Sequence, residues 1–462
     1  MPSRPRASTS LPPRILATLE RALRRTNREA ARRWPGEAAG RQPVHVVYGG
    51  AQLFRANTPR RLGDLALAAL DEYAPDAPAL AAAVGLSPSD AAVMDLVRAR
   101  VAAKLRAEPV EDYRIDFEDG YGERSDVEED GHAQAAARAV ASGMNARTVP
   151  PFIGIRIKPM TAERAVRGLR TLDLFVTTLV RESGGALPAS FVVTLPKILV
   201  AGHVTVLVRA CEALERSLRL HSGAIGLELM IETPQAILGH RGEVAVPALV
   251  AAGAGRVGSV HFGPYDYTAR CGITAAWQRL QHPACDFARH LIQMALAQSA
   301  VRLCDGPTNV MPVPRHRTAA DAPLTVQQQA DNRASVHDAW QQHFEDVTHS
   351  LRAGIFQGWD LHPAQLVTRY AALYTFFLSA RAEATARLRR FIAEAAQATM
   401  SGNVFDDAAT GQGLLNFFVR GLECGALTVA MAEETGLTAD ELRTRSFLVI
   451  LERRSAAAHS RK

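Results

Sequence analysis

Two carboxylates close two neighbouring apolar runs near the middle of the chain. Glu232 directly follows residues 225–231, and Asp266 comes shortly after residues 257–262 and Gly263. Apolar runs of this length that end in Thr-Pro or Gly-Pro are typical of buried parallel strands. Because the carboxyl ends of parallel strands meet at one side of a sheet, we expect the two acids to lie close together. Two hard oxygen ligands on adjacent strands suit Mg²⁺ or Mn²⁺.

Six further apolar runs repeat this pattern, so that eight strand-like segments alternate with helical sequence. Between the two central runs, residues 235–252 have the length of one helix. The alternation predicts an α/β fold, a (β/α)8 TIM barrel. A doubly wound open sheet is the competing architecture, but no GxGxxG motif follows the first strand. The six further runs are residues 44–48, 113–117, 152–157, 191–195, 300–304 and 355–361.

The barrel is expected to carry additions at both ends. Residues 1–40 form a basic N-terminal extension, in which residues 15–34 have helical spacing and many arginines. We expect this segment to be a surface helix that packs on the body of the protein. Residues 41–375 are predicted to be the catalytic TIM-barrel domain, and residues 376–462 a C-terminal helical region.

Composition narrows the function classes. Of 462 residues, 47% are apolar, which is enough for a large core, and the formal net charge is +6. No aromatic-studded basic motif accompanies this charge, so we expect a small anionic substrate rather than nucleic acid. No run approaches the roughly 20 apolar residues of a membrane span, and no membrane partner is expected. Five scattered cysteines without a CxxC pair favour reduced thiols and a cytoplasmic protein.

If the barrel forms, the polar residues that follow its strands gather at one end, which we call the mouth. A cluster of acids and cations at a barrel mouth is where this fold places its chemistry. The residues expected there are Glu118, Asp119, Arg156, Lys158, Lys197, Glu232, Asp266, Asp305 and His362.

Six short segments, in this order along roughly residues 44–370, resemble the HpcH/HpaI aldolase and citrate lyase β-subunit family, which includes malyl-CoA lyases. Each segment contains at least one of the residues expected at the mouth. The insertion before His362 and the arginine-rich N-terminal segment depart from compact family members, which indicates a divergent member and leaves its substrate open. The segments are IDFEDGYG (115–122), IRIKP (155–159), TLPKI (194–198), MIETPQAIL (230–238), HFGPYDYTARCGI (261–273) and GWDLHPAQL (358–366).

The resemblance implies a role for each matching position. Glu232 and Asp266 would ligate Mg²⁺, and Arg156 would hold a carboxylate or carbonyl oxygen of the substrate. Glu118 and Asp119 would hold metal-bound waters. Further candidates for substrate contact are Lys158, Lys197, Gly263, Pro264 and His362, of which His362 could equally be a hydrogen-bonded structural histidine.

The proton donor or acceptor would come from a neighbouring subunit in the acyl-CoA members of this family. Asp406, next to Asp407, lies in a segment that resembles the donor region, so the active form would be a homo-oligomer. This aspartate could instead only begin a helix.

The resemblance and the chemistry converge on a Mg²⁺-dependent carbon–carbon lyase or aldolase. It would act on a hydroxy acid, a 2-oxo acid or its CoA thioester. Cleavage beside a carbonyl leaves an enolate, whose negative oxygen needs a cation and a guanidinium in a dry pocket. The alternatives are a non-catalytic or regulatory barrel that binds metal or a small acid, and, less well supported, phosphoryl transfer.

Individual residues also have structural alternatives. Glu232 could cap the helix that begins at the following Thr-Pro, and Asp266 could stabilise a turn. Arg156 could pair with a carboxylate such as Glu118. Lys197 could instead form a Schiff base, which would make the enzyme metal-independent.

Overall fold

The computed structural model describes residues 10–36, 40–86, 93–318, 323–393, 399–401, 404–406 and 408–460. Its centre is a closed barrel of parallel strands in the order β1 to β8, with β8 pairing back onto β1. The predicted (β/α)8 barrel is therefore confirmed, with every strand within a few residues of its expected position. The strands are His45–Gly50 (β1), Asp112–Asp116 (β2), Phe152–Arg156 (β3), Phe191–Leu195 (β4), Gly226–Ile231 (β5), Val257–Phe262 (β6), Arg302–Pro307 (β7) and Gln357–Asp360 (β8).

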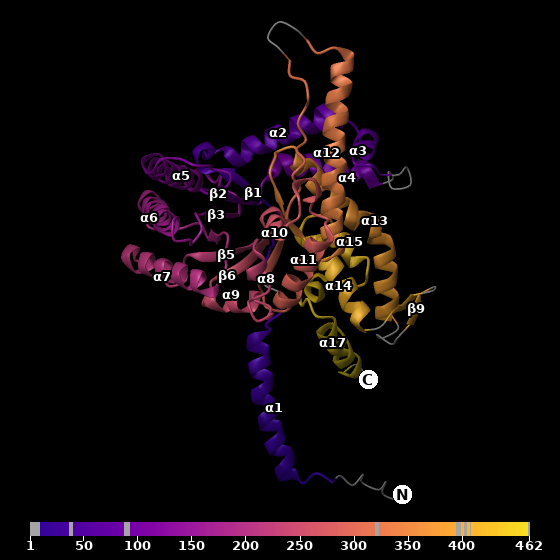
Figure 1. The fold of residues 1–462 in the computed structure, drawn as a ribbon. Coiled ribbons are helices and arrows are strands. Elements are labelled where there is room, and N and C mark those ends of the chain that lie inside the picture. Colours follow the sequence, from indigo (N-terminus) through magenta and orange to yellow (C-terminus); the bar gives the residue numbers. More distant parts are fainter. Residues whose placement is uncertain are drawn as a thin grey trace, which may run out of the picture.

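Helices surround the barrel and continue beyond it at both ends of the chain (Figure 1). Local capping explains where the longer ones begin: Ser125 and Glu128 form a reciprocal capping box at the start of α5, and Thr325 and Gln328 do the same for α12. The helices preceding β7 are Pro13–Arg33 (α1), Thr58–Tyr73 (α2), Ala77–Ala83 (α3), Met94–Ala107 (α4), Asp126–Ala146 (α5), Ala165–Glu182 (α6), Ala201–Leu218 (α7), Pro234–Ile237 (α8), Val246–Ala252 (α9), Pro264–Arg270 (α10) and Pro283–Leu296 (α11).

The C-terminal helices pack beside the barrel (Figure 1). The long α13 runs through residue 375, the position at which the sequence predicts a domain boundary, and its Phe377 contacts Phe417 of α14 with ring centroids 5.1 Å apart. A short hairpin separates α13 from α14. These elements are Val326–Arg352 (α12), Gln365–Ala393 (α13), Thr399–Ser401 (β9), Val404–Asp406 (β10), Ala408–Glu423 (α14), Val429–Glu433 (α15), Ala439–Arg443 (α16) and Phe447–Ser460 (α17).

A polar layer fills the barrel interior below the mouth. Glu228 of β5 is fully buried and accepts hydrogen bonds from Arg114 of β2 at 2.6 and 3.0 Å. Thr194 and Ser259 each donate to the same carboxylate at 2.7 Å. Buried carboxylates and guanidiniums are tolerated when they are paired and hydrogen-bonded, so this layer connects β2, β4, β5 and β6 beneath the candidate site.

The prediction of one helix over residues 235–252 is wrong. The chain instead forms two short helices, α8 and α9, with a turn between them that is closed by a bridge between Leu238 and Val244. Gly242 adopts φ +79°, a backbone conformation that an α-helix cannot contain. The glycines at 239 and 242 therefore break the apolar pattern that suggested a continuous helix.

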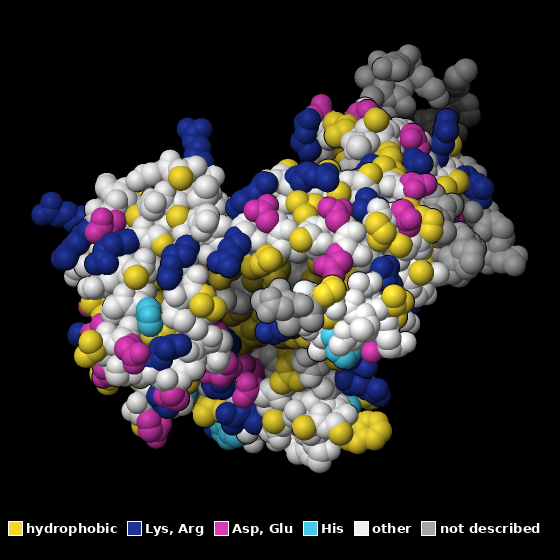
Figure 2. Space-filling model, turned by 90° about the horizontal axis from the view of Figure 1, so that it is seen from above, with side chains coloured by type: hydrophobic (Ala, Val, Ile, Leu, Met, Phe, Trp, Pro, Cys, Tyr) yellow, Lys and Arg dark blue, Asp and Glu magenta, His cyan; other side chains and the backbone are white. Residues whose placement is uncertain are grey.

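The N-terminal helix α1 forms as predicted, but the expectation that it packs on the body is wrong. None of its side chains is buried, and Figure 1 shows it projecting away from the barrel. Across the face of the molecule seen in Figure 2, basic and acidic side chains are interspersed. Among the described residues, no helix has both the length and the apolar character needed to cross a membrane.

Candidate functional site

A buried arginine marks the centre of the mouth. Arg156, the last residue of β3, is 2% exposed and lies opposite Asp116 in the register between β2 and β3. Its Nε donates to Asp116 Oδ1 at 2.7 Å, and its Nη2 donates to Oδ2 at 2.5 Å. The guanidinium also lies over the rings of Tyr48 and Trp359, with its carbon 5.0 and 5.5 Å from their centroids. A bidentate carboxylate and two aromatic rings fix its plane.

Asp116 was not predicted to be a site residue, although it lies in the IDFEDGYG segment. Besides holding Arg156, its carboxylate accepts from the backbone N–H groups of Glu118 at 2.9 Å and Gly120 at 2.7 Å. Asp116 therefore shapes the turn that carries Glu118 and Asp119. The available signal was its place as the last residue of a strand beside the arginine strand.

The turn after β2 brings two carboxylates to the guanidinium of Arg156. The Nη1 of the arginine lies 3.2 Å from Glu118 Oε2 and 3.6 Å from Asp119 Oδ2. Burial raises the pKa of Glu118 to about 7, against the opposing effect of the arginine and with a contribution from Asp119. Arg156 thus pairs with carboxylates of its own chain, Glu118 among them, as one of the sequence alternatives allowed.

Lys197 connects this acidic turn to the next two strands. It follows β4 with φ +50°, and its backbone N–H donates to Glu232 Oε1 at 2.6 Å. Its Nζ contacts Glu118 and lies 2.8 Å from Asp119 Oδ1 and 3.9 Å from Asp266 Oδ2. The left-handed backbone turns both the amide and the ammonium of one residue toward the carboxylates.

The charge state of Lys197 argues against Schiff-base chemistry. Burial acts to lower the pKa of its ammonium, but the carboxylates of Glu118 and Asp119 outweigh burial and raise it. A Schiff-base lysine needs a lowered pKa, so that the neutral amine is available as a nucleophile. In this environment Lys197 is a cation that neutralises acids.

The two predicted metal ligands face the same mouth. Glu232 follows β5 and is 2% exposed, and burial together with the nearby charge of Asp266 raises its pKa to about 8. Glu232 does not cap the following helix, because Thr233 accepts the capping hydrogen bond from Ala236. Gly263, after β6, leaves room for the carboxylate: a Cβ there would lie 2.7 Å from Glu232 Oε2. Gly263 therefore serves the site by having no side chain.

The donor set fits a hard divalent cation. Among the described residues, no group of three or more His, Cys, Asp and Glu side chains is arranged as a ready-made metal site. The carboxylates of Glu118, Asp119 and Asp266 nevertheless surround the Lys197 ammonium, and Glu232 accepts from the amide of the same residue. Carboxylate oxygens, in excess over the cations beside them, are the ligands that Mg²⁺ and Mn²⁺ prefer.

Two residues expected at the mouth lie elsewhere. Lys158 is buried against α5, where its Nζ donates to the carbonyl of Phe117 and pairs with Glu129, both at 2.9 Å. Asp305 pairs with Arg289 of α11 at 2.9 Å and accepts from Ser350 of α12. Both side chains connect the barrel to its helices, so the structure does not bring them together with Glu232.

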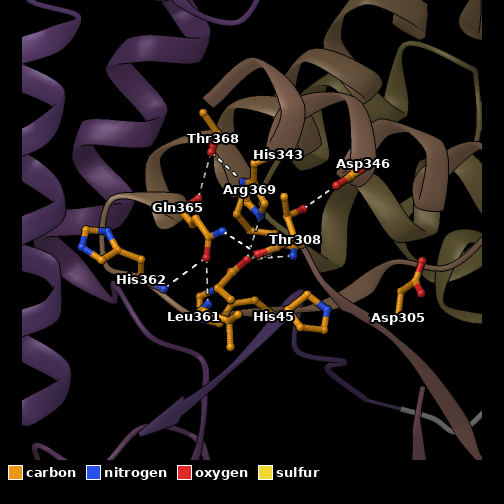
Figure 3. A network of polar contacts seen from close by, with 12 residues as sticks. His45, Asp305, Thr308, His343, Asp346, Leu361, His362, Gln365, Thr368 and Arg369 are labelled. Atoms are coloured by element: carbon orange, nitrogen blue, oxygen red, sulfur yellow. Dashed lines mark hydrogen bonds and ion pairs between the residues drawn. The ribbon is translucent and has the colours of Figure 1, made fainter. Parts of the chain in front are cut away.

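His362 lies at the turn between β8 and α13, beside a buried polar network (Figure 3). The side-chain oxygen of Gln365 accepts from the backbone N–H groups of Leu361 at 2.8 Å and His362 at 3.1 Å, and its amide donates to the carbonyl of Thr308 at 3.1 Å. His362 Nδ1 accepts from the N–H of Ala364, and burial lowers the pKa of its ring. The network fixes the turn and leaves Nε2 as the ring atom that can meet a ligand.

The remaining predicted residues are Pro264 and Asp406. Pro264 is the first residue of α10, the short helix that carries Asp266 in its first turn. The backbone of Asp406 ends β10, but its side chain, like all of Asp407, lies outside the described residues.

Comparison with known families assigns the chain to one of them. A family model described as "Domain of unknown function (DUF6986)" matches residues 23–450. The chain belongs to this family. No curated protein matches the DUF6986 chain.

Three solved structures are similar to this chain, and one of them has a TM-score above 0.5. A citrate lyase from Burkholderia xenovorans LB400 is similar with a TM-score of 0.53 and 18% identity, over 87% of this chain and 98% of that chain. CitE from Mycobacterium tuberculosis, in complex with magnesium, acetoacetate and coenzyme A, has a TM-score of 0.45 and 16% identity over 84% and 99% of the two chains. A malate synthase from Haloferax volcanii, in complex with magnesium and glyoxylate, has a TM-score of 0.44 and 14% identity over 86% and 89%. The first of these supports the sequence resemblance to citrate lyases at the level of fold.

Proposed function

We propose that this DUF6986 protein is a Mg²⁺- or Mn²⁺-dependent carbon–carbon lyase or aldolase. Its substrate would be a hydroxy acid, a 2-oxo acid or a CoA thioester of such an acid, and the reaction would pass through an enolate. The observation that supports this most is the group of carboxylates around the Lys197 ammonium, beside the buried guanidinium of Arg156. The fold shared with a citrate lyase adds support at the level of architecture.

Arg156 would stabilise the oxygen on which negative charge develops. Its orientation is set before substrate binds, because Asp116 holds two of its N–H groups and the rings of Tyr48 and Trp359 flank it. A guanidinium that needs no reorganisation is most effective in a site that excludes water, where its charge is poorly screened. Its planar fork also suits a substrate carboxylate better than an ammonium would.

Glu232 and Asp266 would hold the divalent cation. When bound, the cation would supply positive charge for a substrate carbonyl oxygen. The backbone amide of Lys197 fixes one oxygen of Glu232 at 2.6 Å, while its ammonium balances Glu118 and Asp119. The chain itself therefore keeps the acids in place, and Glu118 and Asp119 remain positioned to hold waters near the cation.

A proton must also move at the carbon that is cleaved or joined. We propose that Asp406 of a neighbouring copy supplies this group, which makes the active form a homo-oligomer. Mixing Asp406→Asn protein with Glu232→Gln protein tests this idea, since a site that combines residues of two chains recovers activity in mixed oligomers. Activity that stays absent after mixing, while each variant folds, contradicts the shared site.

Calorimetric titration with Mg²⁺ tests the proposed metal ligands. Glu232→Gln and Asp266→Asn should each weaken Mg²⁺ binding by about 100-fold or more, because each removes a charged ligand. Glu123→Gln is the matched control: this carboxylate also lies beyond β2, but it is exposed and pairs with Arg164, so its replacement should leave affinity unchanged. Unchanged affinity in both site variants would overturn the proposed function.

Turnover separates the lyase from the non-catalytic alternative. The wild-type protein with Mg²⁺ is assayed against a panel of hydroxy acids and 2-oxo acids, each as the free acid and as the CoA thioester. Cleavage or condensation of one of these, lost in Arg156→Lys, supports the lyase. Metal binding without turnover of any of them favours a regulatory barrel that binds a small acid.

A further inference from the structure

The projecting helix α1 has one apolar face with no partner. Along this face lie Ile15, Leu16, Leu19 and Leu23, which are 41–59% exposed, and the exposed Trp34 follows the last residue of the helix. Residues at these spacings share one side of a helix. None of the side chains of α1 is buried in the described structure, so this apolar stripe faces solvent.

The opposite face of α1 is arginine-rich. Between Pro13 and Arg33 the sequence has seven arginines and two glutamates, a net charge of +5. Two of the arginines pair with the glutamates within the helix, Arg24 with Glu20 at 3.4 Å and Arg33 with Glu29 at 3.6 Å. Most of the net positive charge of the whole chain, +6, is thus concentrated on one exposed helix.

The pattern is poorly suited to pairing with the α1 helix of a second copy. A helix pair needs apolar residues that repeat at every third and fourth position along the whole contact. The stripe that starts at Leu16, Leu19 and Leu23 continues through Thr26 and Ala30 and then reaches Arg33. A pair would also bring together two helices of the same strong charge.

We propose that α1 binds the surface of an anionic lipid bilayer. A helix with leucines on one face and arginines on the other lies in the plane of the membrane interface, with its apolar face among the acyl chains and its cations at the headgroups. The length and charge of α1 match this mode, and the helix lies on the membrane without spanning it. This inference is independent of the proposed chemistry, and it revises the expectation that the protein has no membrane partner.

The attachment point of α1 keeps the candidate site accessible. The segment after the helix reaches the barrel where Gly36 donates to the carbonyl of Gln298, just before β7, and then enters β1 at His45. This is the end of the barrel at which strands begin, whereas Arg156 and Glu232 lie at the carboxyl ends of their strands. A lipid-bound α1 therefore leaves the mouth open to small substrates.

Vesicle co-sedimentation tests the proposal with the full-length protein. Vesicles of phosphatidylcholine alone are compared with vesicles that contain about one-third phosphatidylglycerol, at low and at high salt. We expect binding to the anionic vesicles, a loss of at least tenfold on the neutral ones, and a marked weakening by salt.

Variants on the two faces of α1 sharpen the test. The triple change Leu16→Ser, Leu19→Ser and Leu23→Ser should reduce binding by at least tenfold, because it removes the apolar face. Changing Arg21, Arg24 and Arg28 to Gln should have a comparable effect at low salt. The matched control is Val166→Ser on α6, a residue that is 80% exposed outside α1, and it should bind like the wild type.

The thermal midpoint of each variant checks that the barrel is intact, and we expect it to be unchanged because α1 buries no side chain. Equal binding to neutral and anionic vesicles overturns the proposal, as does binding that survives the triple serine change. Failure to bind anionic vesicles also overturns it. In that case, a dimer that dissociates in the triple variant would identify a second copy as the partner, and retention of duplex DNA through the arginines would identify nucleic acid. Vesicle binding that is retained in Glu232→Gln keeps this test separate from that of the lyase chemistry.

Discussion

Two buried carboxylates of the same barrel have opposite environments. Asp360, the last residue of β8, pairs with Arg369 at 2.8 Å and His343 at 3.0 Å; Arg369 and His343 belong to the network of Figure 3. These two partners outweigh the effect of burial and lower the pKa of Asp360. Glu232, at the end of β5, accepts a backbone N–H and faces the charge of Asp266, and its pKa rises to about 8.

The difference distinguishes a carboxylate that stabilises the fold from a carboxylate that is available to a ligand, within the same barrel. A neutralised acid such as Asp360 fixes two helices against a strand and has little remaining capacity for a ligand. An acid such as Glu232, held in place with its charge unbalanced, has stability to gain from a bound cation. Strongly perturbed carboxylates in a recess are candidates for function for this reason.

Replacing each carboxylate by its amide should give the largest contrast. Asp360→Asn leaves Arg369 buried without a counter-ion and should lower the free energy of unfolding by about 3–5 kcal/mol. Glu232→Gln replaces a carboxyl group whose ionised form is disfavoured by burial and by Asp266, and should leave the metal-free protein as stable as the wild type or more so. Urea denaturation in the presence of a chelator measures both. Equal destabilisation by the two changes would mean that Glu232 is as well neutralised as Asp360.

The pH dependence of stability gives the next largest effect. The pKa of Glu232 is raised from 4.5 to about 8 in the folded protein, so the folded state retains a proton that the unfolded state loses. Glu232 should therefore make the metal-free protein less stable as pH rises from about 5 to about 7.5, with a contribution of about 3 kcal/mol from this group alone. Glu232→Gln should reduce this slope and leave a smaller one from Glu118, whose pKa is also raised, to about 7.

Denaturation midpoints at three pH values, with and without Mg²⁺, measure this dependence. Because Mg²⁺ binds the ionised carboxylates, its stabilising effect should increase with pH over the same range. A free energy of unfolding that rises with pH in the wild type would contradict the raised pKa.

Removing the ammonium at the mouth should give a smaller change. Lys197→Met takes away a positive charge within 4 Å of Asp119 and Asp266, and we expect Mg²⁺ to bind roughly tenfold more tightly, since the cation no longer competes with the lysine. Arg164→Met, which removes a half-exposed cation beside Glu123, is the control. Weaker Mg²⁺ binding in Lys197→Met would show that the ammonium organises the acids instead of competing for them.

The strands and the central acids could be predicted because both depend on local pattern. Each buried strand is an uninterrupted apolar run, and the residue that follows it must lie at the mouth when the strands are parallel. Glu232, Asp266 and Lys197 do lie together in the structure, and their roles at the site stay a prediction. The local pattern cannot show which side chains pair with one another, and so Asp116, the residue that orients Arg156, was missed.

The residues that lie elsewhere follow a different rule. Side chains alternate between the two faces of a strand, and Cys304 belongs to an interior cluster with Tyr48 and Met230. Its neighbour Asp305 must therefore face outward, where it meets Arg289. Lys158 lies beyond the end of β3, where alternation no longer applies, and the path of the loop directs it to α5.

Helix packing was less predictable than strand order. A basic amphipathic helix has the same sequence pattern whether its apolar face packs on the protein, on another copy or on a lipid surface. The sequence of α1 therefore could not predict where this helix lies. The division of this stretch into the two short helices α8 and α9 likewise depends on Gly242, one residue with a left-handed backbone within an otherwise apolar stretch.

The way in which Glu232 is anchored has a consequence for variation within the family. Its oxygen is held by the main-chain amide of position 197, which every amino acid except proline possesses. A substitution of Lys197 would therefore change how strongly its side chain competes with a bound cation for the carboxylates, while Glu232 would stay where it is. Ion preference could evolve here through a single side chain, without rebuilding the scaffold that presents the ligand.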